Sequence, residues 1–357
     1  MHTQTELDRI VVSGERIPVA ILGATGMVGQ VFVHLLATHP RFKPVALCAS
    51  DLRTGQTYRN ACQWQLPFPF PEEMGDMTLI SADPKTLREA GVVIAFSALP
   101  AHTAAKLEPE LARHGMPVFS NAGALRTRRD VPILIPDVNP DALGLIRHQG
   151  WPETGFVVTN ANCAVTGLAT ALAPLKPFGI EDVHVSTCQS VSGAGYPGLS
   201  ALDIQDNVIP HIPNEEEKIA GELDKILEQH VDTWVTALRV PVRFGHLETV
   251  WVRFAQPVST DDVRRAWQNH RGLRLPSMPE LPVVYLEGEN QPQPRDSFLG
   301  TPAGMPVFTG RLRERGGRIG FVLLVNNIIK GAAGGSVLNA ELFLERMGDL
   351  SHGLEKP

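Results

Sequence analysis

Cys163 is the residue of this chain with the clearest potential for covalent chemistry. It lies in the segment 160–167 (NANCAVTG), at the first turn of an expected helix that directly follows an apolar strand. The helix dipole and the unpaired backbone N–H groups at such a position favour a thiolate and can stabilise an oxyanion. A small cysteine buried in the core is the alternative interpretation. Cys48 and Cys188 lie inside expected strands and Cys62 in a polar loop, so we expect these three to be structural.

Arg239 and His246 are the candidate partners of that thiol. They flank a turn that contains Pro and Gly, at the end of one expected strand and the start of the next. The Arg239 guanidinium could bind a carboxylate through two hydrogen bonds, and the His246 imidazole could activate the thiol as a base. Because the chain has 12 histidines, one near an arginine is no surprise, and this pairing alone carries little weight.

The segment 21–29 has a glycine pattern typical of dinucleotide-binding loops. Gly23, Gly26 and Gly29 lie where a first strand turns into a first helix. In this pattern the first glycine permits the tight turn, the second lets the backbone approach a pyrophosphate, and the third lets helix and strand pack closely. A glycine-rich turn without a ligand is the alternative, but its place between a strand and a helix favours a dinucleotide site. The loop residues expected to bind the cofactor are Gly23, Thr25, Gly26, Met27 and Val28.

The end of the second strand bears on which dinucleotide binds. Asp51 would suit the ribose 2′-hydroxyl of NAD, whereas Arg53 would suit the 2′-phosphate of NADP. Ser50, Arg53 and Thr54 together can bind a dianion through charge-assisted and hydroxyl hydrogen bonds. We therefore expect NADP(H), with Asp51 directed to solvent.

The elements that must position these residues follow two different patterns. In the first half, short apolar runs alternate with helical patterns, which predicts a doubly wound parallel sheet with helices on both faces. From about residue 156 the pattern changes to strands with alternating burial, which predicts an α+β domain on a more antiparallel sheet. The expected strands are 17–22, 44–49, 92–96, 117–119, 156–159, 182–190, 247–254 and 317–326. The expected helices are 28–38, 101–114, 163–175, 215–229 and 334–347, and the packing partner of the last one cannot be inferred.

Composition limits the kinds of protein that this chain can be. Its 357 residues predict two domains, and the 32 Lys and Arg against 38 Asp and Glu give a net charge of −6, which argues against a nucleic-acid partner. We find no signal peptide, and no apolar run approaches the roughly 18 residues of a membrane span, so a cytoplasmic protein is expected. The four cysteines suggest neither a disulfide framework nor a metal site.

Taken together, these residues resemble the aspartate-β-semialdehyde dehydrogenase family. The chain is most similar to the archaeal and fungal-like branch, which also contains malonyl-CoA reductases. The resemblance runs from residue 18 to about residue 345. It rests on segments 23–29 (GATGMVG), 96–100, 160–165, 189–198, 206–210, 215–218, 239–246, 292–295 and 327–334. So many matches in the same order are highly specific.

The resemblance implies a fold like that of glyceraldehyde-3-phosphate dehydrogenase. The Rossmann-type NADP-binding domain would span residues 1–159, completed by the C-terminal helix 328–357. The catalytic and dimerisation domain would span residues 160–327 and form a homodimer or homotetramer. The implied activity is NADPH-dependent reductive dephosphorylation of L-aspartyl-4-phosphate, through a thioester, to the 4-semialdehyde.

The resemblance also implies a role for each candidate residue of the reaction. Cys163 would be the acyl-accepting nucleophile and His246 the general acid and base. Gln189 would orient the bound acyl group. Arg239 would bind the substrate carboxylate and Glu215 the substrate amino group.

Further residues would bind the phosphate and the cofactor. Arg126 and Lys218 are the implied phosphate ligands. The residues implied at the nicotinamide end are Ser97, Ala98, Leu99, Gly193, Gly195 and Asn327. Glu216 and Glu217 are expected to form a solvated helix face.

Two departures from the family pattern concern the substrate more than the chemistry. Gly123 replaces a serine that relatives usually carry, and Pro213 and Asn214 precede Glu215 where small residues are usual. A malonyl-CoA reductase or another acyl reductase therefore stays an alternative, because the same thioester chemistry follows when a thiol leaves instead of phosphate. A non-catalytic paralogue is a third reading, disfavoured because Cys163 and His246 are both present.

Overall fold

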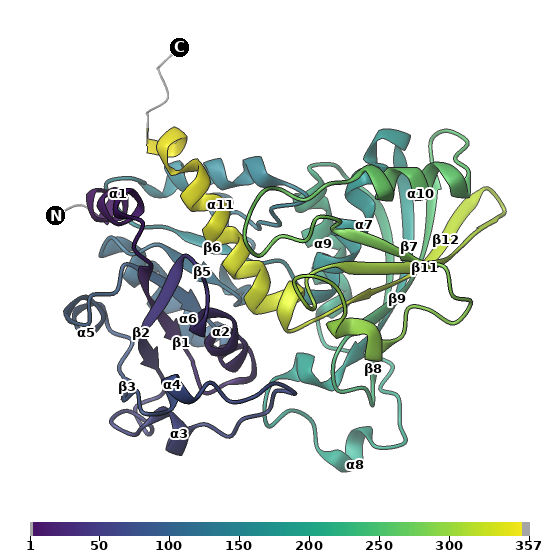
Figure 1. Ribbon diagram of the computed structural model, residues 1–357. Helices are drawn as coiled ribbons and strands as arrows, with labels where there is room; N and C mark the ends of the chain where they lie inside the picture. The colour runs from purple at the N-terminus through teal and green to yellow at the C-terminus, as the bar shows by residue number, and fades with distance from the viewer. Residues whose placement is uncertain (1–2, 352–357) are drawn as a thin grey trace. The chain divides into compact units, whose positions relative to one another are not determined.

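The computed structural model describes residues 3–351 and divides into two units, each built on its own six-stranded sheet (Figure 1). The first unit comprises the described parts of Met1–Leu134, Asp141–Asn160 and Ser336–Pro357. The second comprises Ile135–Pro140 and Ala161–Gly335. Residues 1–2 and 352–357, which fall within the expected NADP-binding domain, lie outside the described residues.

The first unit has the expected parallel sheet. Its strand order is β3-β2-β1-β4-β5-β6, and every neighbouring pair is parallel. Most strand residues are buried, which explains why the strands are continuous apolar runs rather than alternating ones. The strands are β1 (Ile17–Leu22), β2 (Phe42–Cys48), β3 (Leu79–Ile80), β4 (Ile94–Ser97), β5 (Val118–Ser120) and β6 (Val157–Thr159).

Helices from both ends of the chain complete this unit. The last helix lies beside the sheet because Phe343 packs against Phe119, Trp151 and Phe156, with ring centroids 6.1, 5.2 and 4.9 Å away. This contact supplies the packing partner that sequence alone could not give. The helices are α1 (Thr3–Ser13), α2 (Met27–Ala37), α3 (Tyr58–Ala61), α4 (Glu72–Gly75), α5 (Pro84–Glu89), α6 (Ala101–Arg113) and α11 (Gly334–Ser351).

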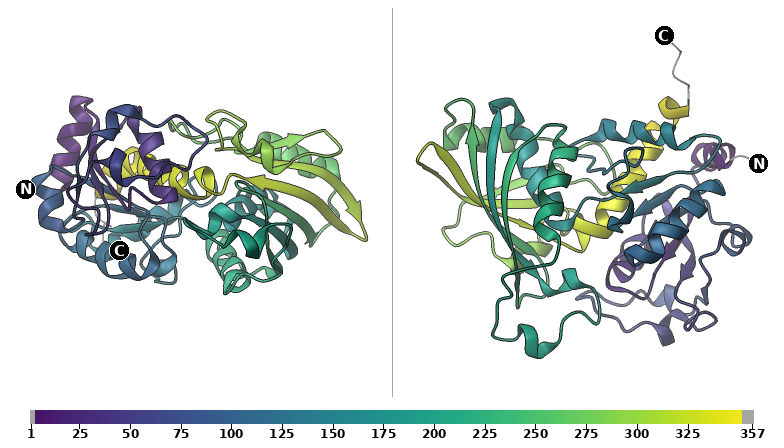
Figure 2. Two further views of the ribbon diagram at one scale, coloured as in Figure 1. Left: turned by 90° about the horizontal axis from the view of Figure 1, so that it is seen from below. Right: turned by 180° about the vertical axis from the view of Figure 1, so that it is seen from behind.

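The second unit has a mixed sheet in the order β10-β11-β12-β9-β7-β8. The pairs β7–β8 and β10–β11 are parallel and the other three are antiparallel, close to the more antiparallel sheet expected. The strands are β7 (Ile180–Ser190), β8 (Asp232–Val240), β9 (His246–Phe254), β10 (Val283–Leu286), β11 (Val307–Arg315) and β12 (Arg318–Val325). The helices are α7 (Cys163–Leu172), α8 (Ala201–Ile204), α9 (Glu215–Leu227) and α10 (Thr260–Asn269), seen from two sides in Figure 2.

The two faces of strand β9 differ in burial, and the candidate residue His246 lies on the buried face. His246, Glu248 and Val250 are buried on one face, whereas Thr249 and Arg253 on the other face are exposed. Helix α7 contacts β9, β11 and β12, and α9 contacts β8. The buried face therefore brings strand side chains toward the helix that begins at Cys163.

The division between the units differs from the expected boundaries. Residues 135–140 belong to the second unit, and the return to the first unit comes after Gly335 rather than after residue 327. Lys330 and Asp137, both buried, form an ion pair at 2.5 Å that holds the 135–140 segment in the second unit. Such a tertiary ion pair has no local pattern in the sequence.

Element ends also shift slightly from the expected ones. Helix α7 ends at Leu172 rather than at residue 175, because a 3₁₀ turn with two prolines (Ala173–Phe178) follows it. Strand β9 begins at His246 itself, so this side chain belongs to the regular alternation of the strand.

Candidate active site

Cys163 and His246 form a close pair in the second unit. Cys163 is the first residue of α7, and its Sγ lies 3.1 Å from His246 Nε2. Asn162 caps the helix, because its side-chain oxygen accepts hydrogen bonds from Ala164 N at 2.9 Å and Val165 N at 3.3 Å. The structure thus brings together a thiol at a helix N-terminus and an imidazole, the arrangement that nucleophilic catalysis by cysteine requires.

His246 is held as a neutral ring. Burial, and then the nearby Arg239 guanidinium, lower the His246 pKa to about 3. On the side away from Cys163, His246 Nδ1 accepts a hydrogen bond from Ser190 N at 3.1 Å. A ring that is neutral near pH 7 can exchange protons with a neighbouring group without first losing a charge.

Arg239 lies beside the same pair, at the end of β8. Its Nη1 donates to Ser190 O at 2.8 Å, and the side chain is buried. A Cβ added at Gly193 would lie 2.8 Å from Arg239 Nη1 and 3.3 Å from His246 Cε1. Position 193 must therefore be glycine for the guanidinium and the imidazole to lie this close to the backbone.

A buried carboxylate is tied to the start of the nucleophile helix. Glu215, the first residue of α9, accepts hydrogen bonds on Oε1 from Gln189 Nε2 at 2.9 Å and from Asn162 Nδ2 at 2.8 Å. Both of these hydrogen bonds use the same oxygen, and within residues 3–351 we find none on Oε2, which is therefore available to accept a hydrogen bond from an ammonium group. Asn162 N also donates to Glu222 Oε2 at 2.6 Å.

The two cationic residues expected at a phosphate lie in different units. Lys218 is exposed on α9, one turn after Glu215. Arg126 belongs to the first unit, where its Nη2 donates to Asn121 O at 3.1 Å. Lys218 therefore belongs to the same unit as Cys163 and His246, whereas Arg126 belongs to the other unit.

Asn327 is buried among the residues that surround His246. Its Oδ1 accepts from Gly245 N at 2.9 Å and from Ser190 Oγ at 3.1 Å, and its Nδ2 donates to Ser192 Oγ at 2.8 Å. Gly195, by contrast, lies in a left-handed turn with φ +79°, with no atom within 4 Å of an added Cβ. The three hydrogen bonds of Asn327 thus connect the end of β7 with the turn that precedes His246.

The glycine loop of the first unit has the geometry of a phosphate cradle. A Cβ at Gly29 would lie 2.1 Å from Gly23 O, and one at Gly23, whose φ is +77°, would lie 2.8 Å from Ala98 O. Helix α2 begins after Gly26 with no side-chain cap, which leaves its first N–H groups to bind an anion. The turn of Ser97, Ala98 and Leu99 thus packs against the loop, and Ala98 N donates to Leu22 O at 2.9 Å.

The end of β2 approaches the same loop. Arg53 Nη1 donates to Thr25 Oγ1 at 2.7 Å, and Asp51 is exposed. Thr54 N and Arg53 N both donate to Ser50 O, so the three residues form one turn. These contacts place a guanidinium beside the phosphate loop, where a 2′-phosphate would need it.

Sequence reasoning missed the residues that brace this loop. Gln30 is fully buried, and its Nε2 donates to Thr25 O at 3.1 Å and to Gln63 O at 3.0 Å. Tyr58 Oη donates to Ala24 O at 3.2 Å. In the sequence, the local sign of this bracing is a glutamine inside an apolar helix.

Sequence reasoning was wrong about Glu216 and missed Glu248. Glu216 is not simply solvated, because its Oε1 accepts from Ala237 N at 3.0 Å and satisfies one backbone N–H on the free side of edge strand β8. Glu248, two residues after His246, is fully buried, and neither carboxyl oxygen has a hydrogen-bond partner among the described residues. Burial, and then the nearby Glu215, raise the Glu248 pKa well above its usual value.

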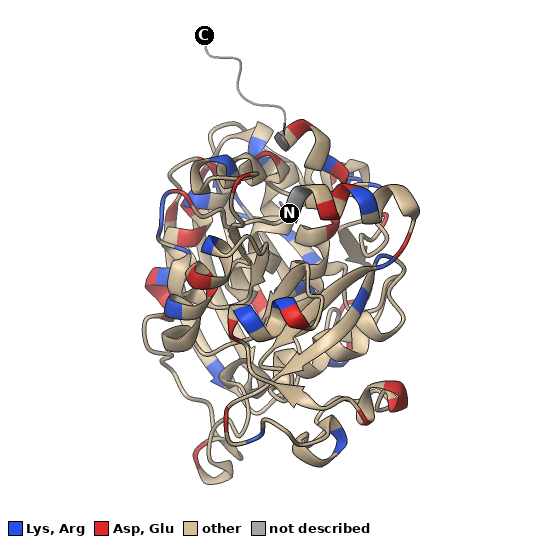
Figure 3. Cartoon of the chain, turned by 90° about the vertical axis from the view of Figure 1, so that its left-hand side faces the viewer, with Lys and Arg blue, Asp and Glu red and all other residues tan. Residues whose placement is uncertain are grey.

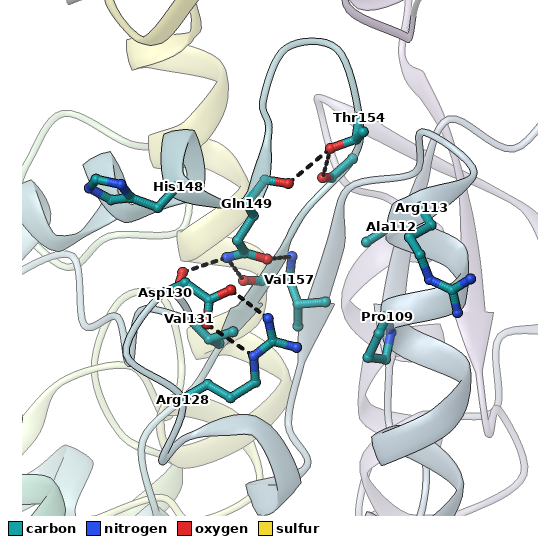
Figure 4. Close-up of a pocket in the computed structure, with 11 residues that line it drawn as sticks. Pro109, Ala112, Arg113, Arg128, Asp130, Val131, His148, Gln149, Thr154 and Val157 are labelled. Carbon is teal, nitrogen blue, oxygen red and sulfur yellow. Dashed lines mark hydrogen bonds and ion pairs between the residues drawn. The ribbon is translucent and has the colours of Figure 1, made fainter.

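Other features of the described residues carry no comparable chemistry. A cavity of about 340 Å³ in the first unit (Figure 4) is bordered by Arg128, which pairs with Asp130, and by Gln149, whose side chain bonds the backbone of Asp130 and Val157. Over residues 3–351 we find no cluster able to hold a metal ion and no helix long and apolar enough to cross a membrane. Acidic and basic residues are interspersed in the view of Figure 3.

Comparisons with known proteins find similar sequences and a similar fold. A family model described as "Semialdehyde dehydrogenase, NAD binding domain" matches residues 18–146, and one described as "Semialdehyde dehydrogenase, dimerisation domain" matches residues 172–330. An aspartate-semialdehyde dehydrogenase of Archaeoglobus fulgidus is 42% identical, over 92% of this chain and 98% of that protein. A malonyl CoA reductase (NADP) of Metallosphaera sedula is 36% identical, over 92% and 96%. The crystal structure of aspartate semialdehyde dehydrogenase with NADP from Candida albicans superimposes with a TM-score of 0.83 at 30% identity, over 92% of this chain and 98% of that one.

Glu248→Gln should make the protein more stable, and increasingly so as the pH rises. In the unfolded chain Glu248 loses its proton above about pH 4.5, whereas in the folded protein burial raises its pKa and it keeps the proton. The wild type therefore loses stability as the pH rises toward the folded pKa, by up to about 1.4 kcal/mol per pH unit, and the glutamine variant lacks this loss. Urea unfolding of both proteins from pH 5 to pH 8 measures the difference, and parallel curves would contradict it.

Proposed function

Because the chain belongs to the semialdehyde dehydrogenase family, we propose that it reduces L-aspartyl-4-phosphate to L-aspartate-4-semialdehyde with NADPH. The observation that carries the proposal is the contact of 3.1 Å between Cys163 Sγ and His246 Nε2 at the start of α7. Arg239 and Glu215 in the same unit supply the charges that the two polar groups of an amino-acid substrate need.

The chemistry begins at the sulfur. His246 takes the proton of the Cys163 thiol, and the resulting thiolate attacks the acyl carbon: a C–S bond forms, the C–O bond to phosphate breaks, and a thioester remains on the enzyme. NADPH, when bound, supplies the hydride that reduces this thioester. His246 then gives a proton to the hemithioacetal oxygen and takes it back as the C–S bond breaks, which releases the aldehyde and restores the thiolate.

The remaining residues bind and orient the substrate in this proposal. Arg239 recognises the α-carboxylate, for which a planar guanidinium is the best match. Glu215 accepts the α-ammonium on Oε2, while Gln189, bonded to Glu215 Oε1, faces the acyl group. Arg126 and Lys218 receive the phosphate and stabilise it as it leaves.

The cofactor contacts follow from the first unit. The open backbone at Gly26 and the close packing at Gly23 and Gly29 fit a pyrophosphate, and Arg53 beside Thr25 fits a 2′-phosphate. Gly193, Gly195 and Asn327 of the second unit, with the turn that begins at Ser97, remain the proposed contacts at the nicotinamide end.

The second unit also supports a homo-oligomer. Residues 172–330 match a dimerisation domain, and the open face of β7, β8 and β9 carries an exposed Trp234 stacked on His184 at 5.7 Å. Trp251 of the same face borders a surface hollow together with these two residues. We propose that a second copy covers this face in a homodimer or homotetramer, and a solution mass equal to one chain would refute it.

Cys163→Ala should abolish turnover while leaving NADPH binding unchanged. Without the thiolate no thioester forms, whereas the proposed phosphate loop lies in the other unit and keeps its structure. The measurement combines a turnover assay with a fluorescence titration of NADPH. Cys188→Ala, which removes a half-buried cysteine inside strand β7, is the matched control and should remain active. Substantial turnover by Cys163→Ala would rule out covalent catalysis at this residue.

Arg53→Ala should weaken NADPH binding by about 1.5–3 kcal/mol and leave NADH binding nearly unchanged. The loss is that of one charge-assisted hydrogen bond to the 2′-phosphate, which NADH lacks. Dissociation constants of both cofactors for wild type and variant measure it. Asp51→Ala removes an exposed charge of the same turn and serves as control. Equal losses for the two cofactors would show that Arg53 does not select the phosphate.

The substrate assignment is tested with variants that affect the binding of phosphate and the binding of the amino group separately. In the aldehyde-oxidising direction, Arg126→Ala and Lys218→Ala should each raise the KM for phosphate about tenfold or more, since each removes a cation from a dianion. Glu215→Ala should instead raise the KM for the amino-bearing aldehyde. Lys106→Ala, an exposed lysine on α6, controls for loss of charge.

A malonyl-CoA reductase is the outcome that would replace this assignment. The acyl part of its substrate carries no α-amino group, and a thiol leaves instead of phosphate, so all three variants would leave its turnover largely intact. Unchanged phosphate dependence in both cation variants, together with robust turnover of malonyl-CoA, would overturn the aspartyl-phosphate proposal.

A further inference from the structure

Ser190, the last residue of β7, contacts the candidate catalytic groups through all of its polar atoms. Its backbone N donates to His246 Nδ1 at 3.1 Å, and its backbone O accepts from Arg239 Nη1 at 2.8 Å. Its hydroxyl Oγ lies 3.2 Å from His246 Nδ1. Both Ser190 and His246 are fully buried, so bulk solvent does not replace these contacts.

The orientation of the Ser190 hydroxyl follows from Asn327. Gly245 N can only donate, and it lies 2.9 Å from Asn327 Oδ1, which identifies that atom as the oxygen. The Ser190 hydroxyl therefore donates its hydrogen to Asn327 Oδ1, at 3.1 Å. Its lone pairs are left to accept, and the nearby donors are His246 Nδ1 and Ser192 Oγ, the latter at 3.2 Å.

The chemistry of an imidazole calls for a hydrogen on Nδ1 during the reaction, and for an acceptor near that nitrogen. Nε2 of His246 faces Cys163, so this nitrogen must gain and lose the proton during the reaction. It can do so without forming an imidazolate only while Nδ1 carries a hydrogen. The backbone N–H of Ser190 favours the opposite tautomer, with Nδ1 bare and the proton on Nε2. A ring held in that tautomer alone would donate a hydrogen bond to the sulfur but could not act as a base there.

We propose that Ser190 is a positioning residue that acts through His246, because its hydroxyl accepts the Nδ1 hydrogen that the ring needs to work as an acid and base. Asn327 and Ser192 hold the hydroxyl in the accepting orientation. The backbone N–H of Ser190 stabilises the resting ring, and its hydroxyl stabilises the reacting one. The group that supports His246 on the side away from Cys163 is thus the Ser190 hydroxyl rather than a carboxylate.

A double-mutant cycle tests this inference, which rests on the acid and base role of His246 in the proposed function. Ser190→Ala should lower kcat about tenfold or more with little change in the KM for NADPH, and Ser190→Thr, which keeps a hydroxyl, should recover most of the loss. His246→Asn should lower kcat by about 100-fold or more. The double variant Ser190→Ala with His246→Asn should be no slower than His246→Asn alone, because a residue that acts through His246 has no further effect without it.

The control is another buried hydroxyl. Ser297 is as buried as Ser190, and its Oγ has no hydrogen-bond partner among the described residues, so Ser297→Ala should keep the wild-type kcat. If Ser190→Ala does not fold, Ser190→Cys, which is nearly isosteric but a weaker acceptor, replaces it in the same cycle.

Two results would overturn the inference alone, and a third would also contradict the acid and base role of His246. A Ser190→Ala kcat within twofold of wild type, or losses that multiply in the double variant, would remove Ser190 from this role while leaving the proposed function intact. A His246→Asn variant with nearly wild-type kcat would instead contradict the acid and base role itself, and the inference with it.

Discussion

The side chain of Asn162 is the point on which the candidate site depends. Its oxygen satisfies the first N–H groups of α7, and its nitrogen holds Glu215 at 2.8 Å, so one amide fixes the helix that carries the nucleophile and the carboxylate beside it. Capping by asparagine contributes about 1 kcal/mol to a helix. Here the same side chain also fixes Glu215 relative to the start of α7, because its oxygen caps the helix and its nitrogen holds the carboxylate.

The second unit gathers several buried charged side chains around this amide. Arg239, Glu215 and Glu222 are all buried, and burial of such groups is costly unless they are hydrogen-bonded or paired. Glu215 and Glu222 accept amide hydrogens, and Arg239 donates to a backbone carbonyl. Glu248 has no such partner among the described residues and keeps its proton instead. The site is thus polar in its groups but buried from bulk solvent, which strengthens the electrostatic contacts within it.

The features that could be predicted from the sequence are those that depend on residues close together in the chain. Gly23 and Gly29 are required by backbone geometry at a strand–helix turn, and the Cys163 helix start shows in the residue order itself, so both features could be recognised without a structure. Contacts between distant segments left no such mark. Glu248 looks like any polar residue of an alternating strand, and the pairing of Asp137 with Lys330, 193 residues later, depends entirely on how the chain folds back. Ser190 also escaped notice, because its importance comes from the ring packed against it.

The interleaved course of the chain has a consequence for how the protein matures. The chain passes between the units after Leu134, Pro140, Asn160 and Gly335, and the first unit needs α11 to cover its aromatic core. During synthesis from the N-terminus, Phe119 and Phe156 emerge from the ribosome long before Phe343 does. The nascent first unit must therefore wait with an open apolar face while the whole second unit is translated, and that interval is when it most needs protection from aggregation.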